Sequence, residues 1–503
     1  MKKMMKVAAA CAVALTLLSA NAVAKKDKGE ATKKEKPAKE KPAKAEKAKP
    51  VKKVKFDQAK FDAAYSIGDY ATCAGMLLGK ADKNTLVKDM LDADMLLYLG
   101  GDYQNAGKGF LETYGTMQQV RAEMDAGKSM AAAMGGENSI KYTGTVYERY
   151  LDWSMRLATA LGNKQYDVAG GIVKDYTGTF MAEIQAMQKQ EEEIAAASEN
   201  SKDSDQYKKA KAAFRLVNVN EKDIDALWDK QPDKPTEADK YDKSPFFSYL
   251  GTLAWAVNDD FDHAEEFADK FGVSQAKDIT KVPAGKGRLE VVALSGQIGK
   301  REDASANVKP TEIRVPNPVP ALDVPYFSLY AKVSYPKFDA AEYRNNHAIN
   351  GVRVTLSDGQ SQNATVIEDF DLAVEKDVKQ KARAAYSRSV FRNVVKNSVT
   401  AGTLATAIAG ALSGNKIAVA AANIVILGLP KAVEAIVNLE RADVRQGVYF
   451  PHMASAKGFN VEPGTYTVTV EYLNGSNVVE TKTIENVVVD AGKVSVAVSA
   501  CEK

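Results

Sequence analysis

The sequence predicts an α+β protein in which a helical-repeat domain at residues 55–280 precedes a β-rich domain at residues 285–503. Two observations lead to this prediction. A Gly-Asp-Tyr triplet at Gly68 returns 33 residues later at Gly101, each time between apolar stretches with helical spacing. A period in the thirties built from helix pairs is typical of stacked helical repeats. After Pro283 the pattern changes to short runs of alternating apolar and polar residues, which favour strands.

The first 24 residues have the pattern of a secretory signal peptide. Three lysines precede an apolar or small-residue run, Val7–Leu18, which is too short to span a bilayer. Ala22-Val23-Ala24 is a small-x-small cleavage site. We expect cleavage after Ala24 and export to the periplasm or the outer-membrane periphery of a bacterium. An uncleaved anchor is the alternative.

Residues 25–54 are a low-complexity linker of Lys, Ala, Glu and Pro, which has too few apolar residues to bury and is predicted to be disordered. The segment Lys25–Lys55 carries 14 lysines against five acids. Two interpretations stay open for this basic tail. It contacts anionic lipid or a cell-wall polymer, or it is a solvated spacer.

The charge distribution bears on the class of partner. The net charge is +3, but the leader and the tail carry the positive excess, so residues 56–503 are mildly acidic. We therefore expect no nucleic-acid partner.

After cleavage two cysteines remain, Cys73 and Cys501. Cys73 falls where the repeat places a small buried residue, which favours a free thiol, and a disulfide between the two is the alternative.

The repeat has a defined set of positions. A glycine permits the turn between two helices, and the aromatic residue two positions later packs across that turn. In the second unit Ala106 allows the helices to approach closely, and Phe110 follows four positions later. This spacing is the core of the tetratricopeptide pattern. The residues that define the repeat are Gly68, Tyr70, Gly101, Tyr103, Ala106 and Phe110.

Two looser units follow along the chain. Leu161-Gly162 leads to Tyr166 and Ala169 after a longer turn, and Asp259-Asp260-Phe261 leads to Ala264. Stacked helix pairs form a concave groove that suits a peptide or a helix. The helical repeats therefore predict binding of another protein.

The second half is predicted to be a β-sandwich-like domain with a helical insertion at about 370–440. The expected strands are residues 288–294, 326–335, 352–356, 465–472, 478–489 and 494–498, with Asn474-Gly475 as a hairpin turn. In the insertion, a long helix from Phe370 to Thr400 precedes two apolar runs within 400–429. We expect these runs to form a buried helical hairpin, and docking onto a membrane or a partner is the alternative.

Arg388, Arg392 and Lys396 recur every four residues on the predicted long helix and so form a basic stripe. The stripe is compatible with contact to an anionic partner or polymer. We prefer the interpretation as a salt-bridged or solvated helix face.

We predict no catalytic, cofactor-binding or metal-binding residues. His263, His347 and His452 are not at ligand spacing, and no cysteine pair neighbours them, so a zinc site is not expected. The sequence has no Gly-x-Ser-x-Gly elbow. The segment Gly127-Lys128-Ser129 lacks the first glycine and the preceding strand of a phosphate-binding loop.

The order of these elements resembles a large family of exported bacterial envelope proteins of uncharacterised activity, with a tetratricopeptide-like N-terminal half and a β-rich C-terminal half. The residues that carry the resemblance are Tyr147-Glu148-Arg149, Leu289–Leu294, Asn350–Lys396, Ala442-Asp443-Val444-Arg445 and Pro463-Gly464-Thr465-Tyr466. They cover roughly residues 56–490. Members are frequently lipoproteins and often sit in gene clusters with activators of peptidoglycan synthases. The resemblance therefore implies an envelope protein.

Two departures from that family limit what is carried over. No lipid-bearing cysteine ends the apolar leader, and Gly170-Gly171-Ile172 stands where the family tends to have an arginine-rich stretch. The family supplies no catalytic residues. We therefore expect a non-catalytic exported scaffold or adaptor that binds other envelope proteins through its helical repeats. The alternatives are an enzyme acting on cell-wall polymer or peptide, and a membrane-docking protein that uses residues 400–429.

Overall fold

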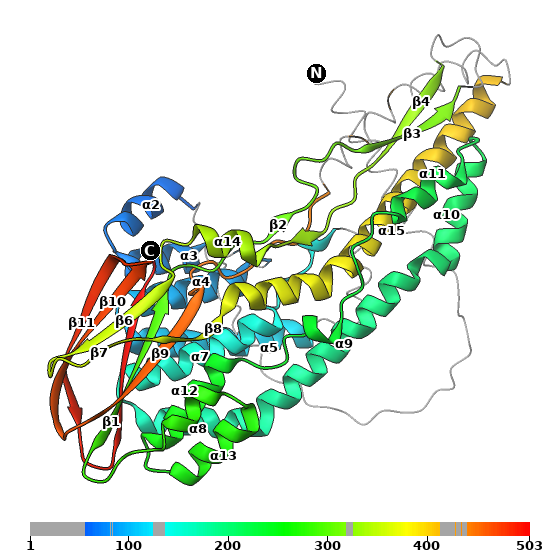
Figure 1. Cartoon of the computed structure of the whole chain (residues 1–503). Coiled ribbons are helices and arrows are strands. Elements are labelled where there is room, and N and C mark those ends of the chain that lie inside the picture. The colour runs from blue at the N-terminus through cyan, green and yellow to red at the C-terminus, as the bar shows by residue number, and fades with distance from the viewer. Residues whose placement is uncertain are drawn as a thin grey trace, which may run out of the picture. The chain divides into compact units, whose positions relative to one another are not determined.

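Four helical hairpins lie between residues 58 and 271, and Figure 1 labels their helices. They are α2 (Gln58–Ser66) with α3 (Tyr70–Gly79), α4 (Leu86–Leu99) with α5 (Tyr103–Ala122), α7 (Val146–Gly162) with α8 (Tyr166–Asp175), and α12 (Pro245–Ala256) with α13 (Phe261–Phe271). The computed structural model describes residues 56–80, 82, 84–123, 136–317, 325–412, 428, 434 and 440–503. The expected signal peptide at 1–24 and linker at 25–54 lie outside the described residues.

The turns of the four hairpins share one backbone geometry. Each contains a residue with left-handed backbone, and the φ values are 74°, 78°, 55° and 63° at Gly68, Gly101, Lys164 and Asp259. The N–H of the next residue reaches a carbonyl five positions back, at 2.8–3.2 Å, as in a Schellman motif. An aromatic residue then begins the second helix, and three positions later the small residues Cys73, Ala106, Ala169 and Ala264 are fully buried.

Further helices connect the third and fourth hairpins. The helix α9 (Met181–Glu199) continues from a π-helical turn, η2 (Tyr176–Phe180), and is followed by α10 (Asp205–Arg215) and α11 (Glu221–Asp225). The chain also forms short 3-10 helices, which are η1 (Glu137–Ser139), η3 (Asn200–Asp203), η4 (Ala226–Trp228), η5 (Glu237–Asp239) and η6 (Ser274–Asp278).

Two four-stranded sheets face each other in the second half. The first has the order β12 (Val494–Cys501), β1 (Gly287–Ser295), β9 (Met453–Val461) and β8 (Thr365–Asp369), with β12 parallel to β1 and the other pairs antiparallel. The second is antiparallel, in the order β11 (Asn477–Val489), β10 (Gly464–Asn474), β6 (Gly351–Leu356) and β7 (Ser361–Asn363). Side chains from both sheets share one apolar core.

The remaining strands accompany a long helix. The helix α15 (Phe370–Leu412) has 43 residues and follows the short helix α14 (Ala340–Asn346). A ribbon of β3 (Thr311–Pro316) and β4 (Tyr326–Ala331) packs with α10 against the C-terminal part of α15, where a second apolar core forms. A further pair joins β2 (Glu302–Asp303) to β5 (Pro336–Lys337).

Two expectations for this half need correction. The strand expected at 326–335 ends at Ala331 and belongs to the ribbon beside α15, not to the two facing sheets. The helix expected to end at Thr400 continues to Leu412, because Ala401, Leu404 and Ile408 pack into the second core. The returning half of the expected helical hairpin, 417–429, lies almost entirely outside the described residues.

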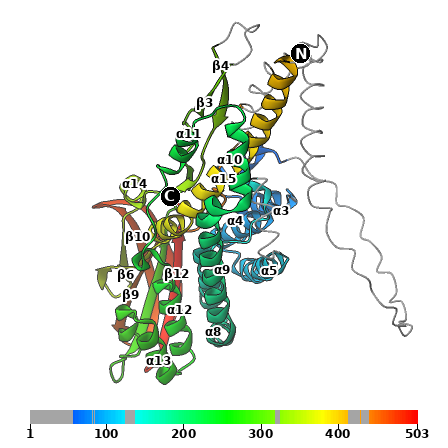
Figure 2. The ribbon, with the colours of Figure 1, turned by 90° about the vertical axis from the view of Figure 1, so that its right-hand side faces the viewer.

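The largest core crosses the boundary between the two predicted domains. It joins the hairpin helices to Val292 and Leu294 of β1 and to Val494, Val496 and Val498 of β12. The helices α12 and α13 lie beside these strands (Figure 2), and residues 53–503 form one compact unit. The structure is about 53% helix and 20% strand, which confirms the predicted α+β class. Among its described helices, none combines the length and apolarity needed to cross a membrane.

Candidate functional site

The basic stripe on α15 is engaged by carboxylates of the same chain. Arg388 Nε lies 2.8 Å from Glu137 Oε1, and Arg392 Nη1 lies 3.0 Å from the same oxygen. Arg392 also pairs with Glu440, whose second oxygen is 3.2 Å from Lys396 Nζ. Arg392 is fully buried. The stripe is thus a salt-bridged helix face, and its contact with an external anion stays a prediction.

This network keeps a buried carboxylate ionised. Burial alone would raise the pKa of Glu137, but the guanidinium groups of Arg388 and Arg392 outweigh burial and lower its pKa to about 2. Glu137 therefore stays negative over the whole range in which proteins usually work. Glu137 also lines a pocket.

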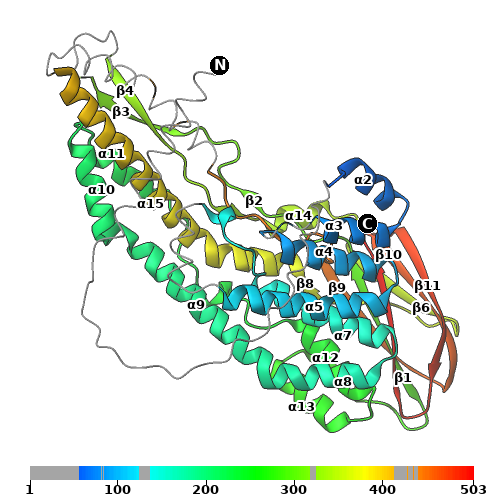
Figure 3. The same cartoon turned by 180° about the vertical axis from the view of Figure 1, so that it is seen from behind.

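The pocket has a volume of about 530 Å³ and lies between α9 and α15. These two helices run side by side (Figure 3). Its other walls are the loop at 140–146, the loop at 234–241 and the segment around Arg445, so both halves of the chain contribute to it. Its lining combines apolar side chains such as Ile194 and Val378 with charged groups of both signs.

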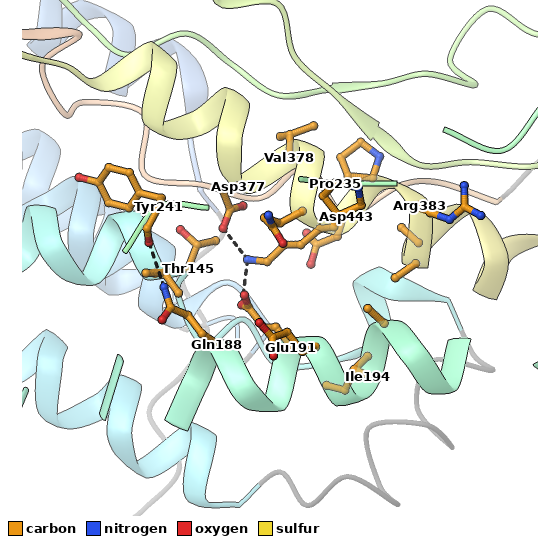
Figure 4. A pocket seen from close by; sticks show the side chains of 18 of the residues that line it. Thr145, Gln188, Glu191, Ile194, Pro235, Tyr241, Asp377, Val378, Arg383 and Asp443 are labelled. Carbon is orange, nitrogen blue, oxygen red and sulfur yellow. Dashed lines mark hydrogen bonds and ion pairs between the residues drawn. The ribbon is translucent and has the colours of Figure 1, made fainter. Parts of the chain in front are cut away.

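A lysine in the lining of this pocket bridges the two helices. Lys381 Nζ, from α15, lies 2.7 Å from Asp377 Oδ1 and 3.2 Å from Glu191 Oε1 of α9. Glu191 and Asp377 point toward each other from the facing helices (Figure 4). Arg301 Nη2 lies 2.7 Å from the other Asp377 oxygen. Burial raises the pKa of Glu191, and Lys381 opposes that rise.

Further ion pairs form within the lining of the pocket. Lys240 lies 3.0 Å from Glu192 and 3.1 Å from Glu237. Arg383 lies 3.0 Å from Glu199. These side chains are partly exposed, so each pair is worth little by itself. Their cost of separation is correspondingly small, and a ligand with charges of its own can exchange partners with them.

The Tyr147-Glu148-Arg149 motif supports the pocket from behind. Arg149 Nη2 donates to the carbonyl of Thr143 at 3.1 Å, and Arg149 also pairs with Glu183. Glu148 closes a capping box with Thr145 and accepts from the Gly447 N–H at 2.7 Å. The motif therefore fixes the loop that forms one wall of the pocket. The Thr145-x-x-Glu148 capping box is a pattern that the sequence contains. The contacts with Glu183 and Gly447 have no such signal, because these partners are 34 and 299 residues away in the chain.

A second polar cluster lies away from this pocket. His347, Asp371 and His452 come from the end of α14, the start of α15 and the residue before β9, and their potential ligand atoms lie within 4.8 Å of one another. The His347 and His452 rings stack with centroids 3.7 Å apart. Burial, reinforced by His347, lowers the pKa of His452 to about 4. Residue spacing does not indicate this cluster, because His347 and His452 are more than 100 residues apart.

Comparisons of the chain with protein-family models, with curated proteins and with solved structures found no match. In the described part of the chain, Cys73 and Cys501 are buried free thiols.

Proposed function

We propose that the protein is a non-catalytic, exported adaptor that holds a charged segment of another envelope component in the pocket between α9 and α15. The observation that carries this proposal is the lining of the pocket, which combines apolar side chains with acidic and basic side chains that form ion pairs. An apolar surface with a few placed charges suits an extended peptide or polymer that carries both signs of charge. Export rests on the leader at residues 1–24.

The helical hairpins serve this proposal as a frame. We infer that they are tetratricopeptide-like units and that the two facing sheets form a β-sandwich. The shared turn geometry supports the first inference, and the common core of the sheets supports the second. In such repeats the groove usually binds the partner. Here α7 is buried from Val146 to Leu161, and α12, β12 and α15 pack against it. Because the chain's own elements cover this helix, we place binding in the pocket.

The ion pairs favour binding over catalysis. Among the described residues of the pocket centre, Asp377, Glu191, Lys381 and Arg301 are all engaged with one another. A general acid or base needs a carboxyl that is free to exchange a proton with substrate. The membrane-docking alternative has less support, because the described part of its apolar segment contributes Ala401, Leu404 and Ile408 to the second core.

The proposal is tested by filling the pocket. Ala195 lines the pocket and is half-buried, so Ala195→Trp should occupy the ligand's place. Ala186 is exposed on the same helix, nine residues earlier, and points about 180° away from Ala195 around the helix. It does not line the pocket, so Ala186→Trp is the matched control. We expect envelope components that co-purify with the parent protein to fall at least tenfold with Ala195→Trp only. Full retention by a folded Ala195→Trp variant would show that the pocket is not the binding site.

A further inference from the structure

Three side chains that could bind a metal converge at the N-terminal end of α15. Asp371 is the second residue of α15 and has a side chain only 1% exposed, while the His347 side chain is 12% exposed. His452 is also buried. Two imidazoles and a carboxylate form a donor set that suits borderline transition metals such as zinc, and suits calcium or magnesium poorly.

Hydrogen bonds already orient two of the three ligands, His452 and Asp371. The Nε2 atom of His452 is 3.0 Å from the Ile349 carbonyl, so this nitrogen donates its hydrogen there and Nδ1 keeps a lone pair. The Gly299 N–H donates to Asp371 Oδ1 at 2.7 Å, which leaves Oδ2 for His347 Nε2, 2.5 Å away. Metal-binding histidines usually donate their second ring N–H to a carbonyl or carboxylate in this way.

A glycine makes room for one of the rings. Gly296 has a φ of 62°, and a Cβ built on it would lie 2.4 Å from His452 Cδ2. A larger residue at this position would displace the His452 ring. The close packing therefore holds His452 in place, while the more exposed His347 ring lies at the wall of an adjoining pocket of about 380 Å³.

We propose that His347, Asp371 and His452 bind one divalent transition-metal ion, such as zinc. The two imidazole planes are 12° from parallel, and lone pairs in parallel planes do not converge on one ion. The His347 ring must therefore rotate out of the stack when the metal enters, and the adjoining pocket gives it space. Three protein ligands leave a coordination position open. The adjoining pocket, lined by Tyr65, Gln297, Asn346 and Glu502, can supply a water or a ligand group there.

The test is titration of the untagged, leader-free chain with cobalt(II), whose visible spectrum reports its coordination, and with zinc(II) by calorimetry. We expect one ion per chain and a cobalt spectrum of low coordination number. His347→Gln should weaken zinc binding at least tenfold, and His452→Gln should do the same. His263→Gln is the control, because His263 is exposed and pairs with Asp260 away from the cluster.

Because His452 is tightly packed, His347→Gln is the deciding variant, and circular dichroism confirms that it folds. Absence of zinc binding at micromolar concentration by the parent chain would overturn the proposal. Equal zinc affinity in the parent and in folded His347→Gln would overturn it too. Neither result bears on the pocket between α9 and α15, which shares no residue with this cluster.

Discussion

The pocket and the helical hairpins both bury carboxyl groups, but they treat the charge in opposite ways. At the pocket, burial of Glu137 is outweighed by Arg388 and Arg392, and its pKa is about 2. In the hairpins, Asp94 of α4 has a hydroxyl partner, Thr113, at 2.6 Å, and burial raises its pKa to about 8. The pocket is thus built to stay charged at neutral pH. The hairpins hold a neutral acid inside a core that depends on packing.

This difference predicts opposite pH dependence of stability. The folded-state pKa of Glu137 lies below its ordinary value of 4.5, so its contribution is present above that pH and is lost as the pH falls toward 2. The folded-state pKa of Asp94 lies above its ordinary value of 3.8, so its contribution is present below that pH and is lost as the pH rises through about 8.

The largest effect is expected at the pocket. Glu137→Gln removes the carboxylate between Arg388 and Arg392 and leaves part of a buried charge network uncompensated. We expect a loss of about 3–5 kcal/mol at pH 7, measured by urea unfolding. The loss should shrink as the pH falls from about 4.5 toward 2. Glu193→Gln, exposed on α9, is the control. A loss that does not change with pH would mean that charge pairing is not its cause.

The hairpins should respond to packing instead. Ala106 is fully buried on α5, so Ala106→Leu should overpack the helix contact and cost about 1–3 kcal/mol. Lys108, two residues later, is exposed, and Lys108→Ala should change the free energy of unfolding by less than about 0.5 kcal/mol. Thermal unfolding of the whole chain measures both. If Ala106→Leu unfolds with the parent, the assigned repeat register is wrong.

Substitutions at two glycines of the second hairpin should change the free energy of unfolding in opposite directions. Gly101 has a φ of 78°, where a β-branched residue is strained, so Gly101→Val should cost about 1–2 kcal/mol. Gly115 is exposed within α5, and a Cβ there would meet no atom within 4 Å. Gly115→Ala should therefore gain about 0.5–1 kcal/mol. Equal melting temperatures for the two variants would contradict the turn geometry.

The smallest expected effect is a gain in stability when Asp94 is replaced by a neutral side chain. Asp94→Asn retains the shape and avoids the cost of burying a charge, so the variant should be more stable than the parent at pH 8 by about 1 kcal/mol, with the Thr113 hydrogen bond offsetting part of that cost. The gain should vanish near pH 4. Asp233→Asn, in an exposed loop, should show no such trend. A gain at pH 4 equal to that at pH 8 would show that the cost of ionising buried Asp94 is not its cause.

The sequence predicted the local geometry best where glycine reports it directly. Gly68 and Gly101 mark the first two turns, whereas Lys164 and Asp259 adopt the same left-handed backbone in the last two without the glycine signal. Strand β9 was missed because Ala454, Ser455, Ala456 and Gly458 have low strand propensity. Neighbouring residues require that smallness, since a Cβ on Gly458 would lie 2.1 Å from the Arg288 guanidinium.

The candidate sites were harder to predict than the elements. The basic stripe was visible from its spacing on one helix, but its partners Glu137 and Glu440 approach from segments 251 and 48 residues away in the chain. The histidine cluster likewise joins three segments. Spacing rules work within one helix or loop, and they carry no information on contacts that only the tertiary fold creates.

The central claim is that a partner enters the pocket between α9 and α15. Photo-crosslinking from two adjacent glutamates of α9 tests it most directly. Glu192 lines the pocket, whereas Glu193 is exposed and points about 100° away around the helix. A photoreactive residue at 192 should capture an envelope component in native cells, and the same residue at 193 should not. Equal capture at both positions, or capture only from Leu111 on the exposed side of α5, would contradict the claim.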